Sequence, residues 1–204
     1  MLLFDTETVN TGGNNKIWEF CGVDTKTRKI YHYFHGENIR QALNTKCNNG
    51  YLMFFNRYQL EYASRFPWLE KEDFIFSISE CLSQYKTLTA YNIGFDAGIL
   101  TGLGFILDDY NLLDLWGTFV KTVAYKPSYI AWTNKHRFLT KTGLPKTDAE
   151  TAYKWYSGFL DFKTPHLALK DIKHELVIYE HLQRQKKKKH YGFFGYNDLK
   201  KVFC

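Results

Sequence analysis

The sequence predicts an α/β domain in which a mixed sheet of five strands is flanked by helices. Residues 1–35 carry a meander pattern, and two further short apolar segments follow at residues 87–91 and 111–116. Apolar residues at helical spacing occupy much of the remaining chain. With 204 residues, 45% of them hydrophobic, and no repeat or long linker, a single folded domain is expected.

Three antiparallel strands are expected near the N-terminus. The apolar start "MLLF" is followed by the turn "NTGGNN" and by the apolar segment "KIWEFCGV". The polar turn "DTKTRK" then leads into "IYHYF". Gly, Asn and Asp at these two places are typical of turns between strands, so the three segments should pair in sequence.

The central part alternates helices and short strands. After a less regular region that contains "ENIRQALNTK" and the aromatic stretch "YLMFFNRY", residues 71–85 are predicted to form a helix. "TLTAY" and "NLLDLW" are the fourth and fifth strands, and the segment from there to about residue 145 shows no clear pattern. Between the two strands, Gly94 is expected in a turn and Asp96 at the opening of a brief helix. The predicted buried stripe of the helix at 71–85 is Phe74, Ile78, Leu82 and Tyr85.

Two helices are expected after residue 145. "TDAETAYKWY" has Thr147 and Glu150 at capping-box spacing, which predicts a helix start. The final helix should begin near Pro165, ending the folded domain at residue 185 and leaving 186–204 as a basic tail. The tract "RQKKKKH", Arg184 to His190, is either a solvated helix end or a phosphate-binding tail. The final helix should bury Leu169, Ile172, Leu176, Tyr179 and Leu182.

Charge and composition narrow the class of partner. With 27 Lys and Arg against 21 Asp and Glu, the net charge of +6 favours an anionic partner, first nucleic acid and second an acidic membrane surface. No apolar run approaches the roughly 20 residues of a membrane span, and no export signal is evident, so a cytosolic protein is expected. The cysteines include no CxxC pair, and we expect them reduced and structural: Cys21, Cys47, Cys81 and Cys204.

Four acidic residues form a candidate metal site. Asp5 and Glu7 alternate on a strand, so their carboxylates share one face and repel each other unless a cation lies between them. Asp96 lies at a strand-to-helix junction and Asp171 one turn into the final helix. Four such carboxylates in one cleft predict two divalent ions about 4 Å apart, and oxygen ligands favour Mg²⁺ or Mn²⁺. His166, with an ordinary pKa of roughly 6.5, is the candidate general base.

Three motifs carry a resemblance to a known family. Asp5 and Glu7 match Asp-x-Glu, Asn92 and Asp96 match Asn-x-x-Phe-Asp together with Phe95, and His-x-Ala-x-x-Asp is matched by His166, Ala168 and Asp171. In this order they resemble the DEDDh 3'–5' exonucleases, the DnaQ-like family of proofreading subunits, RNase T and oligoribonuclease. The resemblance covers residues 2 to about 182, and "TDAETAYKWYSGFLDFKTPHLALKD" is similar to phage and bacterial members in particular. It implies an RNase H-like fold.

The resemblance also implies an activity and a site. The expected reaction is metal-dependent 3'–5' removal of nucleoside 5'-monophosphates from a single strand, with DNA favoured over RNA, in a bacterial or phage-infected cytoplasm. Asp5, Glu7, Asp96 and Asp171 would hold two Mg²⁺ or Mn²⁺ ions, and His166 would be the base. The first motif departs from the family at Val9 and Asn10, which affects how the terminal nucleotide is gripped. The expected substrate contacts are Thr6, Thr8 and Asn92.

Other interpretations remain open from the sequence. The substrate could be RNA, or the chain could be a catalytically silent nucleic-acid-binding module. Asp5 and Glu7 could form a solvated strand end, Asp96 a helix cap, Asn92 a turn and His166 a surface or capping residue. On the final helix, exposed side chains are expected at His174 and His181.

Overall fold

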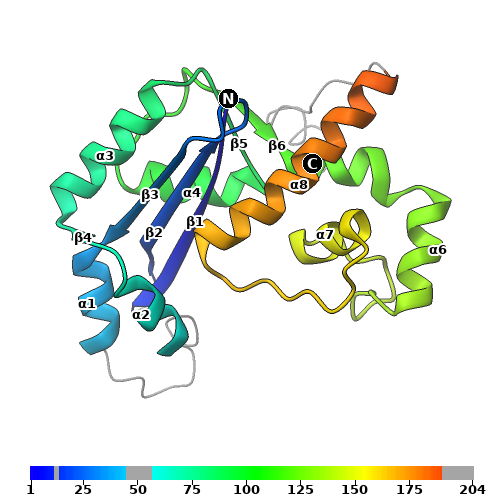
Figure 1. The fold of residues 1–204 in the computed structure, drawn as a ribbon, viewed down its shortest axis with the longest axis horizontal. Coiled ribbons are helices and arrows are strands. Elements are labelled where there is room, and N and C mark those ends of the chain that lie inside the picture. Colours follow the sequence, from blue (N-terminus) through cyan, green and yellow to red (C-terminus); the bar gives the residue numbers. More distant parts are fainter. Residues whose placement is uncertain (12–13, 45–56, 190–204) are drawn as a thin grey trace.

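The computed structural model describes residues 1–11, 14–44 and 57–189 (Figure 1). Several sequence predictions therefore lie outside the described residues. They are the centre of the first turn, most of the aromatic stretch at 51–58, Cys47, Cys204 and the tail from residue 190. The other two cysteines, Cys21 and Cys81, are buried and free.

A six-stranded mixed sheet forms the centre of the molecule, in the order β4-β3-β2-β1-β5-β6. The predicted meander is confirmed, because β1 (Leu2–Thr11), β2 (Asn14–Asp24) and β3 (Ile30–His35) are antiparallel neighbours. β5 (Thr87–Ala90) pairs in parallel with β1, and β6 (Asn111–Asp114) with β5. The predicted α/β architecture, a mixed sheet with helices beside it, is thus confirmed.

The sixth strand was not predicted. β4 (Trp68–Leu69) has only two residues and adds in parallel to the edge of β3. A segment of two residues is too short to show an alternating pattern, so nothing in the sequence marks it as a strand.

Helices cover both faces of this sheet. They are α1 (Gly36–Asn44), α2 (Arg57–Ala63), α3 (Lys71–Ser83), α4 (Ile93–Gly102), α5 (Leu115–Phe119), the π-helical turn η1 (Val120–Ala124), α6 (Pro127–His136), α7 (Ala149–Ser157) and α8 (Ala168–Lys189). Figure 1 shows α3 and α8 on opposite sides of the sheet. No helix in the described ranges is both long and apolar enough to cross a membrane.

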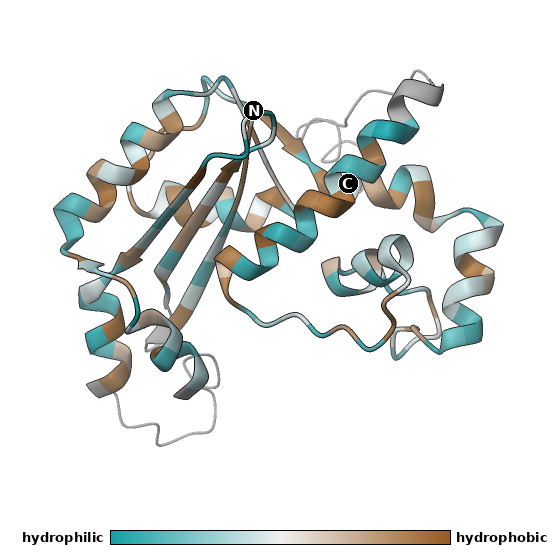
Figure 2. Ribbon diagram, in the orientation of Figure 1, coloured by the Kyte–Doolittle hydropathy of each residue, from teal (hydrophilic) through white to brown (hydrophobic). Residues whose placement is uncertain are grey.

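Three hydrophobic clusters form the core of the described residues, and alternation along β1 directs its first residues into two of them. Leu2 and Phe4 pack against α3 and α4, whereas Leu3 between them packs against α5 and α8. The predicted stripes of the helices at 71–85 and on α8 all pack into these two clusters. Figure 2 shows the corresponding concentration of hydrophobic residues in the strands.

Three predicted helix starts are displaced. α4 begins at Ile93, so Gly94 lies within the helix, and the turn is made by Asn92 with φ of 66°. The cap of α7 is Asp148, whose carboxylate accepts from the backbone N–H of Thr151 at 2.7 Å; Thr147 lies one residue too early. α8 begins at Ala168, three residues after Pro165, and extends to Lys189.

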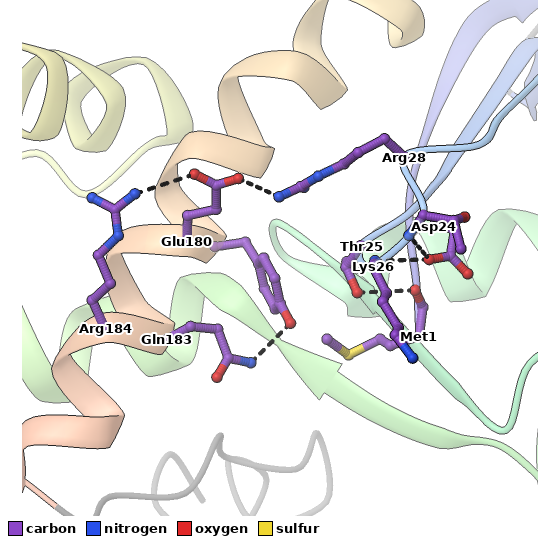
Figure 3. Close-up of polar contacts among 10 residues, drawn as sticks. Met1, Asp24, Thr25, Lys26, Arg28, Glu180, Gln183 and Arg184 are labelled. Carbon is purple, nitrogen blue, oxygen red and sulfur yellow. Dashed lines mark hydrogen bonds and ion pairs between the residues drawn. The ribbon is translucent and has the colours of Figure 1, made fainter.

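The turn between β2 and β3 is attached to α8 (Figure 3). Asp24 accepts from the backbone N–H groups of Lys26 and Thr27, both at 2.7 Å, and these bonds lower the pKa of its carboxyl to about 2. Arg28, with φ of 66°, reaches across to Glu180. The contact holds the C-terminal half of α8 against the hairpin.

Candidate active site

A cleft of about 220 Å³ opens where β1, the starts of α4 and α7, and the first two turns of α8 meet. All four acids predicted from the sequence line it, together with His166 and two of the three predicted substrate contacts. Residues 158–167 lead into α8 as a connection that is neither helix nor strand (Figure 1). The lining residues are Asp5, Thr6, Glu7, Tyr91, Asn92, Phe95, Asp96, Ala149, Glu150, Phe162, Thr164, His166, Asp171, His174 and Glu175.

Asp5 and Glu7 lie in the middle of β1, because the strand continues to Thr11 in register with β2. A strand end exposed to solvent is therefore ruled out for this pair, and both side chains are half-buried. The pairing with β2 shifts by one residue immediately after Glu7. Thr8, a predicted substrate contact, lies beyond this bulge and does not line the cleft.

Asp96 is buried in the first turn of α4 and joins that helix to β1. Its Oδ1 accepts from the hydroxyl of Thr6 at 2.7 Å and from the Thr6 backbone N–H at 3.0 Å. Burial raises the pKa of Asp96 to about 7, and the bonds from Thr6 oppose that rise. Asp96 is not a helix cap, since that position belongs to Asn92.

Asp171 faces the same cleft from α8. Its Oδ2 accepts from the backbone N–H of Leu167 at 3.0 Å, whereas Oδ1 is buried without a partner. Burial is the main cause that raises the pKa of Asp171 to about 7. As predicted, the residue lies one turn into the helix, so one carboxylate oxygen stabilises the helix start and the other faces the cleft.

His166 lies just before α8 with φ of 52°, in the left-handed region that few side chains other than Asn, Asp and His adopt. Its backbone carbonyl accepts from the side chain of Gln59 on α2 at 3.0 Å. The exposed imidazole has a ring nitrogen that forms, with carboxylate oxygens of Glu7 and Asp171, a group whose atoms all lie within 4.8 Å of one another. The structure thus brings the predicted base to the predicted ligands.

Asn92 has the same backbone conformation at the start of α4. Its side chain makes no capping hydrogen bond and is exposed at the cleft. The turn function left open by the sequence is therefore present, and the amide remains free to meet a ligand.

Two residues of α8 were not predicted in the cleft. Glu175 lies one helical turn after Asp171, is 5% exposed, and has a buried Oε2 without a partner. His174 was expected to be exposed; instead it is half-buried, and its ring packs against Phe162 and Tyr153 with centroids 4.2 and 4.7 Å away. The spacing of four from Asp171 to Glu175 is the signal in the sequence that could have placed Glu175 on the same face of the helix. His181 is likewise half-buried, stacked on Tyr156.

Glu19 on β2 does not line the cleft but binds the start of α8, and this role was not predicted from the sequence. It is completely buried, and its carboxylate accepts from the backbone N–H groups of Ala168 and Leu169 at 3.0 and 3.2 Å. His32 contacts the same carboxylate at 2.7 Å. Glu19 therefore caps α8 across the sheet. A glutamate within an apolar strand is the sequence signal for such a buried, partnered charge.

Mutual repulsion and burial dominate the electrostatics of the cleft. Burial raises the pKa of Asp5 well above its usual range, and Glu175 and Asp96 raise it further. Burial and Asp171 act in the same way on the pKa of Glu7. Asp5 Oδ2, Asp171 Oδ1 and Glu175 Oε2 are all buried without a hydrogen-bond partner. Carboxylate oxygens in this state, with one imidazole beside them, fit a site for Mg²⁺ or Mn²⁺.

Comparison with known proteins gives only remote likenesses. No protein-family model matches the chain, and no curated protein is significantly similar to it in sequence. Among solved structures, exonuclease X in complex with 5'-overhanging duplex DNA is similar with a TM-score of 0.48 and 16% identity, covering 94% of each chain. Cell-death related nuclease 4 is similar with a TM-score of 0.35 and 14% identity, covering 90% of this chain and 63% of that chain. Neither likeness establishes an activity for this protein.

Proposed function

We propose that the protein is a metal-dependent 3'–5' exonuclease that releases nucleoside 5'-monophosphates from single-stranded nucleic acid, with DNA favoured. The observation that carries this proposal is the set of buried carboxylate oxygens without partners in one cleft beside an exposed histidine. Burying several carboxylates together is costly unless cations compensate their charge. The three motifs that resemble DEDDh exonucleases all contribute to this cleft.

Asp5, Glu7, Asp96 and Asp171 would hold two divalent ions, Mg²⁺ or Mn²⁺. Such ions polarise a phosphodiester and stabilise the charge of the attacking and departing oxygens. Thr6 keeps Asp96 oriented toward the cleft through its two hydrogen bonds. The Leu167 N–H does the same for Asp171.

His166 would accept the proton of the attacking water. Its imidazole is exposed next to Glu7 and Asp171, so it can reach a water in the cleft and return the proton to solvent. The left-handed backbone of His166 sets the direction in which its side chain leaves the main chain. The hydrogen bond from Gln59 to the His166 carbonyl stabilises this backbone conformation.

The substrate would enter beside α4. Phe95 is 44% exposed and lines the cleft, three residues after Asn92 and directly before Asp96. An exposed ring in this position can stack on any unpaired base, whatever its identity. Stacking of this kind favours the binding of a single strand over that of a duplex. The backbone at Thr6 and the amide of Asn92 would contact the terminal nucleotide.

The direct test uses matched DNA and RNA oligonucleotides labelled at the 5' end, incubated with Mn²⁺ or with EDTA. We expect a ladder that shortens from the 3' end, mononucleotide products, and no reaction in EDTA. The Asp171→Asn variant should lose activity by about a thousandfold or more, whereas Asp109→Asn, at an exposed site away from the cleft, should retain it. Degradation that persists in EDTA, or full activity of Asp171→Asn, contradicts the proposal.

A further inference from the structure

Glu175 is a buried acid that the proposed reaction does not use. It lies on α8 four residues after Asp171, and side chains at this spacing share one face of a helix. Its exposure is 5%, it lines the cleft, and its Oε2 is buried without a partner. An ordinary structural glutamate in a helix would be solvated or ion-paired. Glu180, which also lies on α8, is an example, because it pairs with Arg28 of the β2–β3 turn (Figure 3).

The groups that act most strongly on Glu175 come from three elements and are carboxylates. Asp96 on α4 and Asp171 on α8 repel it, as does Glu7 on β1, while the backbone at Tyr91 provides a hydrogen bond. Glu175 and Asp5 both line the cleft, and each has a buried carboxylate oxygen without a hydrogen-bond partner. The repulsion that Glu175 exerts on Asp5 agrees with this arrangement.

A neutral buried glutamic acid would be the simplest alternative. Such a group is stable when its O–H donates to an acceptor and its other oxygen accepts. In Glu175 one oxygen has no partner of either kind among the described residues. A cation next to Asp5 would satisfy this oxygen and Asp5 Oδ2 together.

We propose that Glu175 is a fifth acidic residue of the cation site, contributing to the binding of the ion next to Asp5. The inference rests on the proposed metal site. Four carboxylates balance two divalent ions in charge, and a fifth makes the empty cleft more repulsive and the occupied one more attractive. Glu175 therefore raises the affinity for the metal at the expense of the stability of the metal-free protein.

The test compares Glu175→Gln with the full-length wild type by Mn²⁺ titration, read by calorimetry and by the electron paramagnetic resonance of free Mn²⁺. The amide has the same size and lacks the charge. We expect a dissociation constant at least tenfold higher for one ion, with an increased melting temperature in EDTA. Glu180→Gln, which changes a partly exposed acid on the same helix that does not line the cleft, should leave Mn²⁺ affinity unchanged.

Three other outcomes would contradict the role of Glu175, the proposed metal site or both. Wild-type Mn²⁺ affinity in Glu175→Gln overturns the role of Glu175 and leaves the proposed function intact. A wild-type protein that binds no Mn²⁺ overturns both. If Glu175→Gln does not fold, Glu175→Asp retains the charge but withdraws it by one methylene, and an unchanged affinity there also overturns the inference.

Discussion

The hydroxyl and the backbone N–H of Thr6 both donate to one oxygen of Asp96, at 2.7 and 3.0 Å. These bonds join the first and second sequence motifs, which are 90 residues apart. They also favour the charged form of a buried carboxyl whose pKa is about 7. Thr6, expected from the sequence as a substrate contact, is therefore also a residue that positions an acid.

Replacing Thr6 with valine should shift the pH dependence of metal binding. The variant loses the hydroxyl bond, so the pKa of Asp96 rises and protons compete better with the metal. We expect about tenfold weaker Mn²⁺ affinity at pH 7, largely restored at pH 9, because one pKa unit corresponds to a factor of ten. Calorimetric titration at both pH values measures this. Thr101→Val, which removes a hydroxyl from the same helix as Asp96, is the control, and an equal loss at both pH values contradicts the account.

The metal-free protein should become less stable as the pH rises from about 4 to 7. Asp96 and Asp171 have a folded pKa of about 7 against an ordinary 3.8, so the folded state binds more protons in this interval. Stability therefore decreases with pH through that window and levels off above it. Asp24 acts oppositely, but its lowered pKa of about 2 confines its effect to the range below pH 4.

Thermal unfolding in EDTA at pH 5 and pH 7.5 measures this trend. We expect the lower melting temperature at pH 7.5 and a smaller difference for Asp171→Asn. Excess Mn²⁺ should reverse the trend, since the metal binds the deprotonated carboxylates. A metal-free protein that is more stable at pH 7.5 than at pH 5 would show that the carboxyls are not mutually destabilising.

Replacing Glu19 with glutamine should destabilise the protein and the start of α8. The amide can accept one of the two backbone bonds from Ala168 and Leu169, but it places a donor opposite the other. We expect a loss of about 2 kcal/mol in the free energy of unfolding, as for a buried charged hydrogen bond. Urea denaturation measures it, with the exposed Glu80→Gln as a control within about 0.5 kcal/mol of wild type. Equal stability of both variants would exclude Glu19 as the cap.

Replacing Phe95 with alanine should weaken substrate binding without unfolding the protein. The ring is 44% exposed at the cleft, and one stacked base contributes about 1–3 kcal/mol. We expect KM for a single-stranded oligonucleotide to rise at least fivefold, with an unchanged melting temperature. Phe76→Ala removes a ring that is 63% exposed on α3, away from the cleft, and should leave KM unchanged. Equal KM values for the two variants would exclude stacking by Phe95.

Sequence patterns predicted the strands of the sheet and the four acids in the cleft. They predicted the helix starts and the positions of Glu19 and Glu175 less well. Alternation in "KIWEFCGV" and helical spacing on α8 are strong local patterns, and both elements are present, although α8 starts and ends later than expected. The starts of α4 and α8 were misplaced because the chain turns into each helix at a residue with left-handed backbone, Asn92 or His166, and neither position is marked by a glycine. Glu19 and Glu175 were missed because their partners lie in other elements, and only the folded chain brings them together.

The most direct test of the metal site is the anomalous diffraction of a crystal soaked in Mn²⁺. We predict anomalous peaks within about 2.3 Å of carboxylate oxygens in the cleft, one bounded by Glu7 and Asp171 and one next to Asp5. A well-ordered crystal that shows no anomalous peak among these side chains at millimolar Mn²⁺ would contradict the central claim that divalent cations hold the buried acids together.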